Sequence, residues 1–135
     1  MKTTTKGMDI TLWVFSGLLA ALFMIAGIAK FFGAMNDEFR GWGYTLEFAT
    51  IVGIIEVLAG IGLLFKRAAG WSALALMVIM LGAIWTHATH AEYAMLALPI
   101  VVFLLLGFVA WGRGLAWESR RPPEVSGATS TPQRT

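Results

Sequence analysis

The chain has 135 residues, of which 58% are hydrophobic and 13% are charged, whereas ordinary soluble domains have about 25% charged residues. This composition excludes a soluble globular protein, and the length leaves room for one membrane domain. The net charge is only +2, and the ten Lys and Arg residues are scattered between hydrophobic runs, so we expect no nucleic-acid partner. Cysteine is absent, which excludes disulfides, thiolate nucleophiles and iron–sulfur clusters within this chain.

Four hydrophobic runs predict four transmembrane helices, since a helix needs about 20 apolar residues to cross a bilayer. The first run follows two lysines, as in a signal peptide, but it is long and has no Ala-x-Ala cleavage site, so we expect a retained span. Short links between the runs predict antiparallel neighbours in an all-α, four-helix transmembrane bundle. The runs cover residues 10–33, 46–65, 71–87 and 94–111.

The positions of the positive charges predict the orientation, because the cytoplasmic flanks of spans collect Lys and Arg. Eight of the ten flank the runs on one side, and only Lys30 and Arg40 belong to the other. We therefore expect residues 1–9 and 113–135 in the cytoplasm, and residues 10–112 as a multi-pass domain in the lipid bilayer of the cell (inner) membrane. The segment 113–135 is rich in Gly, Ser, Thr and Pro, which predicts disorder.

Glu56 is the most informative residue, because a carboxylate about 10 residues into the second run lies near the middle of the membrane. Intramembrane ionisable groups usually face protein or water, and helical periodicity places small residues on the same face as Glu56. Glu56 is therefore a candidate proton carrier, ligand anchor or general acid or base, or else a structural carboxyl group that hydrogen-bonds to another helix. The small residues on its face are Ala49, Gly53, Ala59 and Gly60.

Lys30 is the second candidate, because it also lies on a small-residue face near the end of the first run. Glu56 is an attractive partner, but it is expected about 10 Å deeper in the membrane than Lys30. Direct pairing therefore requires the lysine stem to dip inward or the helices to be offset, and Glu38 or Glu47 could compete. The alternative is that Lys30 extends only to the outer headgroups.

His87 and His90 lie three residues apart on one helical face, where the third run meets the outer surface. Such a pair could bind a metal, ligate a haem, hydrogen-bond a quinone carbonyl or pass protons, or could simply be polar residues at an interface. No His-Glu-x-x-His signature is present, and a metal would need a further ligand from another loop, so we expect no metal site. His87 is the stronger candidate because it lies deeper.

The link between the first two runs, residues 34–45, mixes polar and aromatic residues with two glycines. It can lie along the membrane surface or cover the helix ends as a lid. Arg40 and Trp42 in this link are secondary candidates for a ligand site, together with His90.

Three motifs occur in order along the chain: AGIAKFF around Lys30, VGIIEVLAGIG around Glu56, and LGAIWTH ending at His87. Together they resemble the DoxX-like family of small membrane proteins over residues 10–112. The resemblance implies a four-helix membrane domain in which Lys30, Glu56 and His87 match the family's polar positions. Some relatives are described as subunits of quinone-linked sulfur oxidation or partners of oxidative-stress enzymes, and distant animal relatives as receptor-assembly chaperones.

Two functions follow as hypotheses. The first is a redox-associated membrane subunit that binds a quinone or other lipid-like molecule in an outward-facing pocket, with Glu56 and His87 handling protons and Lys30 holding a carbonyl or anionic group. The second is a non-catalytic assembly or scaffold protein for a membrane complex, with other membrane or redox proteins as partners. A small transporter would need a homo-oligomer, and a membrane enzyme acting on an apolar substrate would need the same acid and base.

Overall fold

The computed structural model describes residues 5–114, and this part of the chain is helical with no strand. The predicted tail, residues 113–135, therefore lies almost wholly outside the described residues, as do residues 1–4. Five α-helices and one 3-10 turn follow one another within residues 5–114. They are α1 (Lys6–Phe31), α2 (Asn36–Gly41), α3 (Leu46–Gly62), α4 (Lys66–Thr89), η1 (Tyr93–Met95) and α5 (Ala97–Arg113).

The long helices coincide with the four hydrophobic runs, but their ends differ from the predicted ones. Helix α1 begins at Lys6 because Thr5 caps it, with its side chain accepting a hydrogen bond from the Met8 amide. Helix α4 begins at Lys66 rather than at residue 71, so Lys66 and Arg67, which fall in the link between the second and third runs, form its first turn. Helix α3 ends earlier than predicted, at Gly62. Polar residues can therefore extend a helix beyond its apolar run.

Among the described residues, three segments are long and apolar enough to cross a membrane: Lys6–Phe31, Lys66–Thr89 and Tyr93–Arg113. Helix α3 is equally apolar in character, but its 17 residues fall short of the about 20 needed for a perpendicular span. Large apolar side chains cover the outer surfaces of the helices, as expected where lipid rather than water is the solvent.

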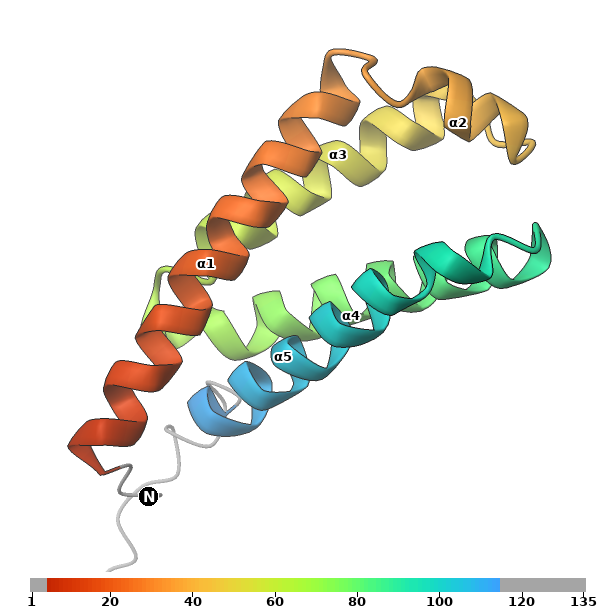
Figure 1. Ribbon diagram of the computed structural model, residues 1–135. Coiled ribbons are helices and arrows are strands. Elements are labelled where there is room, and N and C mark those ends of the chain that lie inside the picture. Colours follow the sequence, from red (N-terminus) through yellow and green to blue (C-terminus); the bar gives the residue numbers. More distant parts are fainter. Residues whose placement is uncertain (1–4, 115–135) are drawn as a thin grey trace, which may run out of the picture.

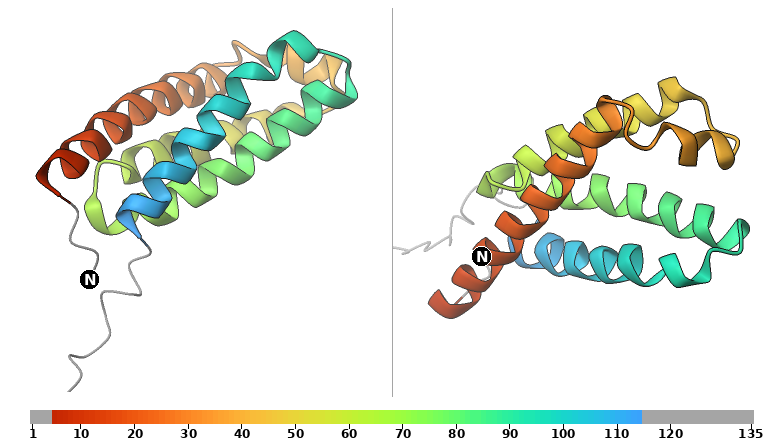
Figure 2. Two further views of the ribbon diagram at one scale, coloured as in Figure 1. Left: turned by 60° about the horizontal axis from the view of Figure 1, so that its bottom comes forward. Right: turned by 45° about the horizontal axis from the view of Figure 1, so that its top comes forward.

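The helices form two antiparallel pairs, α1 with α3 and α4 with α5 (Figure 1). The pairs meet at what we call the closed end, where α1 begins, α3 turns into α4, and α5 finishes. They diverge toward the open end, which carries α2 and the link between α4 and α5; the right-hand view of Figure 2 shows the same divergence. The bundle is therefore V-shaped, with the arms joined at one end.

Glycines allow α1 and α3 to approach closely. A methyl group added at Gly53 would lie 2.7 Å from the carbonyl oxygen of Gly27, and one added at Gly27 would lie 2.5 Å from the carbonyl oxygen of Gly53. No real side-chain carbon tolerates such distances, so both positions require glycine. This backbone contact is typical of membrane helices that associate through small residues, and it fixes the register of the two helices.

The apolar core lies between the two pairs toward the closed end. It contains Leu19 and Phe23 from α1, Leu76 from α4, and Leu106 and Val109 from α5, all of them buried. Because this core fills the space near the closed end, any cavity between the pairs is confined to the open half.

A charged cluster fastens the closed end. The Asp9 carboxylate on α1 accepts a hydrogen bond from the Arg113 guanidinium on α5 at 2.8 Å and lies 3.6 Å from the Lys66 ammonium on α4. Both cations also lie over the ring of Trp13, at 4.8 Å for Arg113 and 5.8 Å for Lys66. Asp9 and Trp13 therefore bind the first arm of the V to the second.

Candidate functional site

Lys30 and Glu56 form an ion pair between α1 and α3. The Lys30 Nζ atom lies 2.8 Å from Glu56 Oε2, and the two side chains are only 11% and 3% exposed. Lys30 follows Gly27 toward the open end and Glu56 follows Gly53 toward the closed end, so the lysine stem runs back along α1 to reach the carboxylate. The inward dip that direct pairing requires is thus present, and the ammonium does not extend to the end of the helix.

The predicted face of α3 is confirmed. Apart from Glu56 itself, the buried residues of this helix are the same four small residues that helical periodicity placed beside it, namely Ala49, Gly53, Ala59 and Gly60. The small residues bring α1 close to α3, which leaves Glu56 enclosed and able to reach Lys30.

A cavity of about 520 Å³ lies between the two arms in the open half of the bundle. Lys30, Glu56 and His87 all line this cavity, although they come from three different helices. Most of the remaining wall is apolar, with Phe23 and Val102 among its buried members. The sequence-derived candidates therefore converge on one space, whose volume is that of an ordinary small-molecule site.

Aromatic side chains from α2, its following loop and the start of α3 cover the open end of the cavity. The Phe39 ring packs against Trp42 and Tyr44 with centroids 5.5 and 6.0 Å apart, and Tyr44 packs against Phe48 at 5.1 Å. All four rings line the cavity. The link that the sequence left as either a lid or an interfacial segment thus supplies an aromatic cover.

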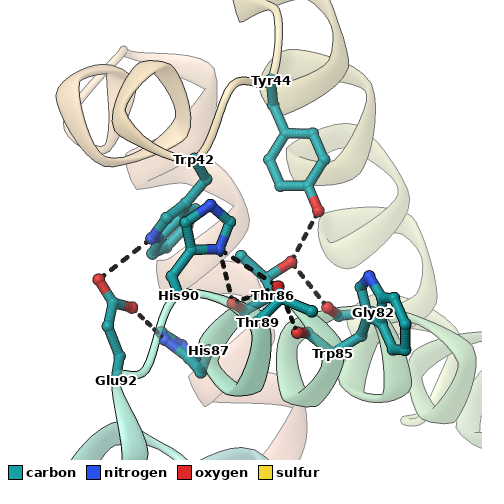
Figure 3. Close-up of polar contacts among 9 residues, drawn as sticks. All are labelled: Trp42, Tyr44, Gly82, Trp85, Thr86, His87, Thr89, His90 and Glu92. Carbon is teal, nitrogen blue, oxygen red and sulfur yellow. Dashed lines mark hydrogen bonds and ion pairs between the residues drawn. The ribbon is translucent and has the colours of Figure 1, made fainter.

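Two hydrogen bonds tie this aromatic cover to the second arm (Figure 3). Trp42 Nε1 donates to Glu92 Oε1 at 3.2 Å, and the Tyr44 hydroxyl lies 2.8 Å from Thr86 Oγ1. The Thr86 hydroxyl donates its hydrogen to the Gly82 carbonyl oxygen, so Tyr44 is the donor in the second contact. We call these two bonds the open-end bridge.

Glu92 also binds His87, because the chain reverses sharply after α4. The Glu92 amide donates to the His87 carbonyl and the Ala91 amide to the Ala88 carbonyl, which together form a Schellman motif. Ala91 takes the left-handed conformation with φ of 58°, where glycine is usual. This turn brings the Glu92 carboxylate within 2.6 Å of His87 Nδ1.

The hydrogen bond from His87, and after it the one from Trp42, lowers the pKa of Glu92 below its ordinary value of 4.5. Glu92 is therefore a carboxylate at neutral pH and can only accept hydrogen bonds. It follows that His87 Nδ1 carries a hydrogen and donates it to Glu92. In the neutral ring, Nε2 is then left as the acceptor.

Sequence comparison identifies the family to which the chain belongs. The model of the DoxX-like family matches residues 14–109, a range that contains Lys30, Glu56 and His87. The chain belongs to the DoxX-like family. No curated protein and no solved structure matches it. Together with its long apolar helices, membership in this family makes the chain a small integral membrane protein.

Two of the secondary candidates lie outside the cavity of this DoxX-like domain. Arg40 is exposed on α2, 3.9 Å from Asp37, and His90 is exposed at the end of α4. His90 Nδ1 lies 2.8 Å from the Thr86 carbonyl oxygen, whereas His87 Nδ1 faces Glu92, so the two histidines do not share a ligand. Trp42 lines the cavity, as His87 does.

Sequence reasoning missed Tyr44, Thr86 and Glu92 as members of the DoxX-like site. Glu92 lies in the link after the third run, and nothing in the sequence singled it out, because its contact with His87 depends on a turn centred on a non-glycine residue. Among residues 5–114, no group of three or more His, Asp or Glu side chains is placed to hold a metal ion.

Proposed function

We propose that this DoxX-like protein is a redox-associated membrane subunit that binds a quinone, or another lipid-like small molecule, in the cavity between its two arms. One observation carries the proposal: Lys30, Glu56 and His87, the polar residues of three helices, all line a single and otherwise mostly apolar cavity.

The chemistry of the wall fits a ring that carries carbonyl or hydroxyl groups. Lys30 has three N–H donors and gives one of them to Glu56, so others remain for a carbonyl oxygen. Glu56 can accept a hydrogen bond from a hydroxyl group, and His87 can exchange a proton at Nε2. The rings of Trp42 and Phe48 can stack on a flat ligand. A bound quinone would supply the electron-accepting chemistry that the side chains lack.

We further propose that all four long helices cross the cell (inner) membrane and that both termini are cytoplasmic. The four helices run antiparallel in pairs, so that α1 begins and α5 finishes at the same closed end. Lys66 and Arg113 lie at this end and Glu92 at the other, which agrees with the preference of Lys and Arg for cytoplasmic flanks. The cavity then faces outward.

The proposal is tested by measuring quinone binding to the protein in lipid nanodiscs. We expect saturable binding of a short-chain ubiquinone or menaquinone, weakened at least about tenfold by Glu56→Gln, because the variant loses both the charge and the ion pair. Glu47→Gln is the matched control, since Glu47 is an exposed residue in the first turn of the same helix. Absence of saturable binding, or equal affinities for the two variants, would contradict the proposal.

The second candidate, an assembly or scaffold role, is favoured by a different observation. Lys30 and Glu56 bind each other beside the closest approach of α1 and α3, as groups that only stabilise helix packing would do. This role predicts that a specific membrane protein co-purifies with the chain from native membranes and is lost from Glu56→Gln protein of unchanged thermal stability. Isolation of the chain alone under the same gentle conditions would count against it.

A further inference from the structure

We infer that the cavity selects ligands with an uncharged polar head, such as an alcohol or a carbonyl group on an apolar body, and rejects fatty-acid anions. This inference rests on the proposed ligand-binding function and specifies the class of ligand. It follows from the charges on the cavity wall, the contacts of those charges and the openings of the cavity.

The charged groups at the cavity leave no net positive charge. Of the residues that line the cavity, Lys30, Glu56 and His87 are the ones with side chains that can carry charge near neutral pH. Lys30 and Glu56 sum to zero wherever their shared proton resides, since the two groups are 2.8 Å apart. His87 is bound to the Glu92 carboxylate, so this second pair is either neutral or negative. The site therefore has no surplus positive charge for an anion.

An anionic head would have to compete with Glu56 for Lys30. If it shared the ammonium, it would lie next to a like charge; if it displaced the carboxylate, it would leave a side chain that is 3% exposed as an uncompensated buried anion. A cationic head that contacted Glu56 would lie next to the like charge of Lys30. A hydroxyl or carbonyl group can instead accept from a free N–H of Lys30, and a hydroxyl can donate to Glu56, with no change in net charge.

The walls indicate how such a ligand enters. Leu22 on α1, Val78 on α4 and Leu98 on α5 line the cavity and are also exposed on the outer surface of the bundle. The cavity thus opens sideways between the arms, onto the apolar surface that contacts lipid in a membrane. Molecules dissolved in the hydrocarbon reach it directly, and uncharged lipids partition there far more readily than ions do.

Oleyl alcohol and oleate test the inference, because they share one hydrocarbon chain and differ in the charge of the head. Binding of each radiolabelled probe is measured with protein in phosphatidylcholine nanodiscs, at a pH where oleate is ionised, against protein-free nanodiscs. We expect the native protein to bind the alcohol at least about tenfold more tightly than oleate. Glu56→Gln, which leaves Lys30 without its carboxylate, should remove this preference by raising the affinity for oleate at least about tenfold.

Two further variants control the result. Lys30→Met together with Glu56→Gln makes the site neutral again and should restore the preference for the alcohol, while Glu47→Gln should behave as the native protein. Thermal unfolding establishes that each variant is folded. Equal binding of both probes to the native protein would overturn the inference even if Glu56→Gln failed to fold, and so would a folded Glu56→Gln with unchanged affinity for oleate.

Quinone binding measured on the same nanodiscs separates this inference from the proposed function. If the native protein prefers the alcohol to oleate but binds no quinone, the inferred selection for uncharged heads stands and the quinone proposal is refuted. If the native protein binds quinone but shows no preference for the alcohol, the quinone proposal stands and the inferred selection for uncharged heads is overturned.

Discussion

Trp42 donates a hydrogen bond to Glu92 across the open end of the bundle, which joins the loop before α3 to the link after α4. Because the two arms diverge toward this end, the contact spans the widest part of the V. The closed end is held by buried apolar residues and several charges, whereas the aromatic cover is tied to the second arm by the open-end bridge.

Acidification should loosen the open-end bridge. His87 and Trp42 lower the pKa of Glu92 from its ordinary value of 4.5, so the carboxylate adds stability above that value. This contribution is lost as the pH falls through the lowered pKa. The protection of the backbone amides of residues 36–45 against hydrogen exchange, relative to the intrinsic rate at each pH, should therefore fall in this acid range in the native protein. In Glu92→Gln this protection should depend less on pH. Identical acid profiles for the two proteins would show that Glu92 does not control the aromatic cover.

Tyr44→Phe should weaken the same bridge without altering charge. The change removes the hydroxyl that donates to Thr86, whose side chain is buried, and one such bond contributes about 1 kcal/mol. We expect a lower midpoint of thermal unfolding in nanodiscs. Tyr93→Phe is the control, since Tyr93 is exposed, and it should have no measurable effect. If both variants unfold at the native temperature, the Tyr44 bond is dispensable.

Ala91→Gly should stabilise the protein. Ala91 has a φ of 58°, where a side chain costs about 1 kcal/mol relative to glycine. The midpoint of thermal unfolding should rise, and the contact between His87 and Glu92 should persist. Ala75→Gly, at an exposed position in the middle of α4, is the control, and it should destabilise the protein by about 1 kcal/mol because glycine is a poor helix former. A fall in stability for Ala91→Gly would contradict the assigned turn.

Gly53→Ala should separate α1 from α3. Its methyl group would lie 2.7 Å from the Gly27 carbonyl oxygen, and overpacking of this kind costs about 1–3 kcal/mol. Gly17→Ala on α1 has open space around it and should be neutral or stabilising. Thermal unfolding of the two variants gives the comparison. Similar midpoints for both would show that the close approach is unimportant.

The charged cluster at the closed end should depend more on Arg113 than on Lys66. The Arg113 side chain is 6% exposed and lies 2.8 Å from Asp9, whereas Lys66 is 59% exposed at 3.6 Å. Arg113→Met should therefore lower the unfolding midpoint clearly, and Lys66→Met only slightly and less at high salt. Unfolding curves at low and high ionic strength measure both effects. A larger loss for Lys66→Met would refute this ranking.

Local patterns predicted the helices and the inward face of Glu56, because periodicity and residue size are properties of a single segment. The partner of Lys30 could not be chosen in this way. Its pairing with Glu56 depends on the register between α1 and α3, which the mutual contact of Gly27 and Gly53 sets.

The open end was the least predictable part of the molecule. Trp42 and Glu92 are 50 residues apart, and the hydrogen bond between them requires two links to fold toward each other. One of these links turns at Ala91, where the residue type gives no indication of a left-handed conformation. The sequence thus contained the polar residues of the cavity but not the arrangement of the residues that cover it.

The V shape has a mechanical consequence. In the transmembrane arrangement proposed above, a bundle whose arms meet at one end and diverge at the other (Figure 1) would displace more area in one leaflet of the bilayer than in the other. In that arrangement, lateral pressure in the leaflet around the open end would push the arms together. Since the cavity lies between those arms, its volume is coupled to the packing of the surrounding lipids.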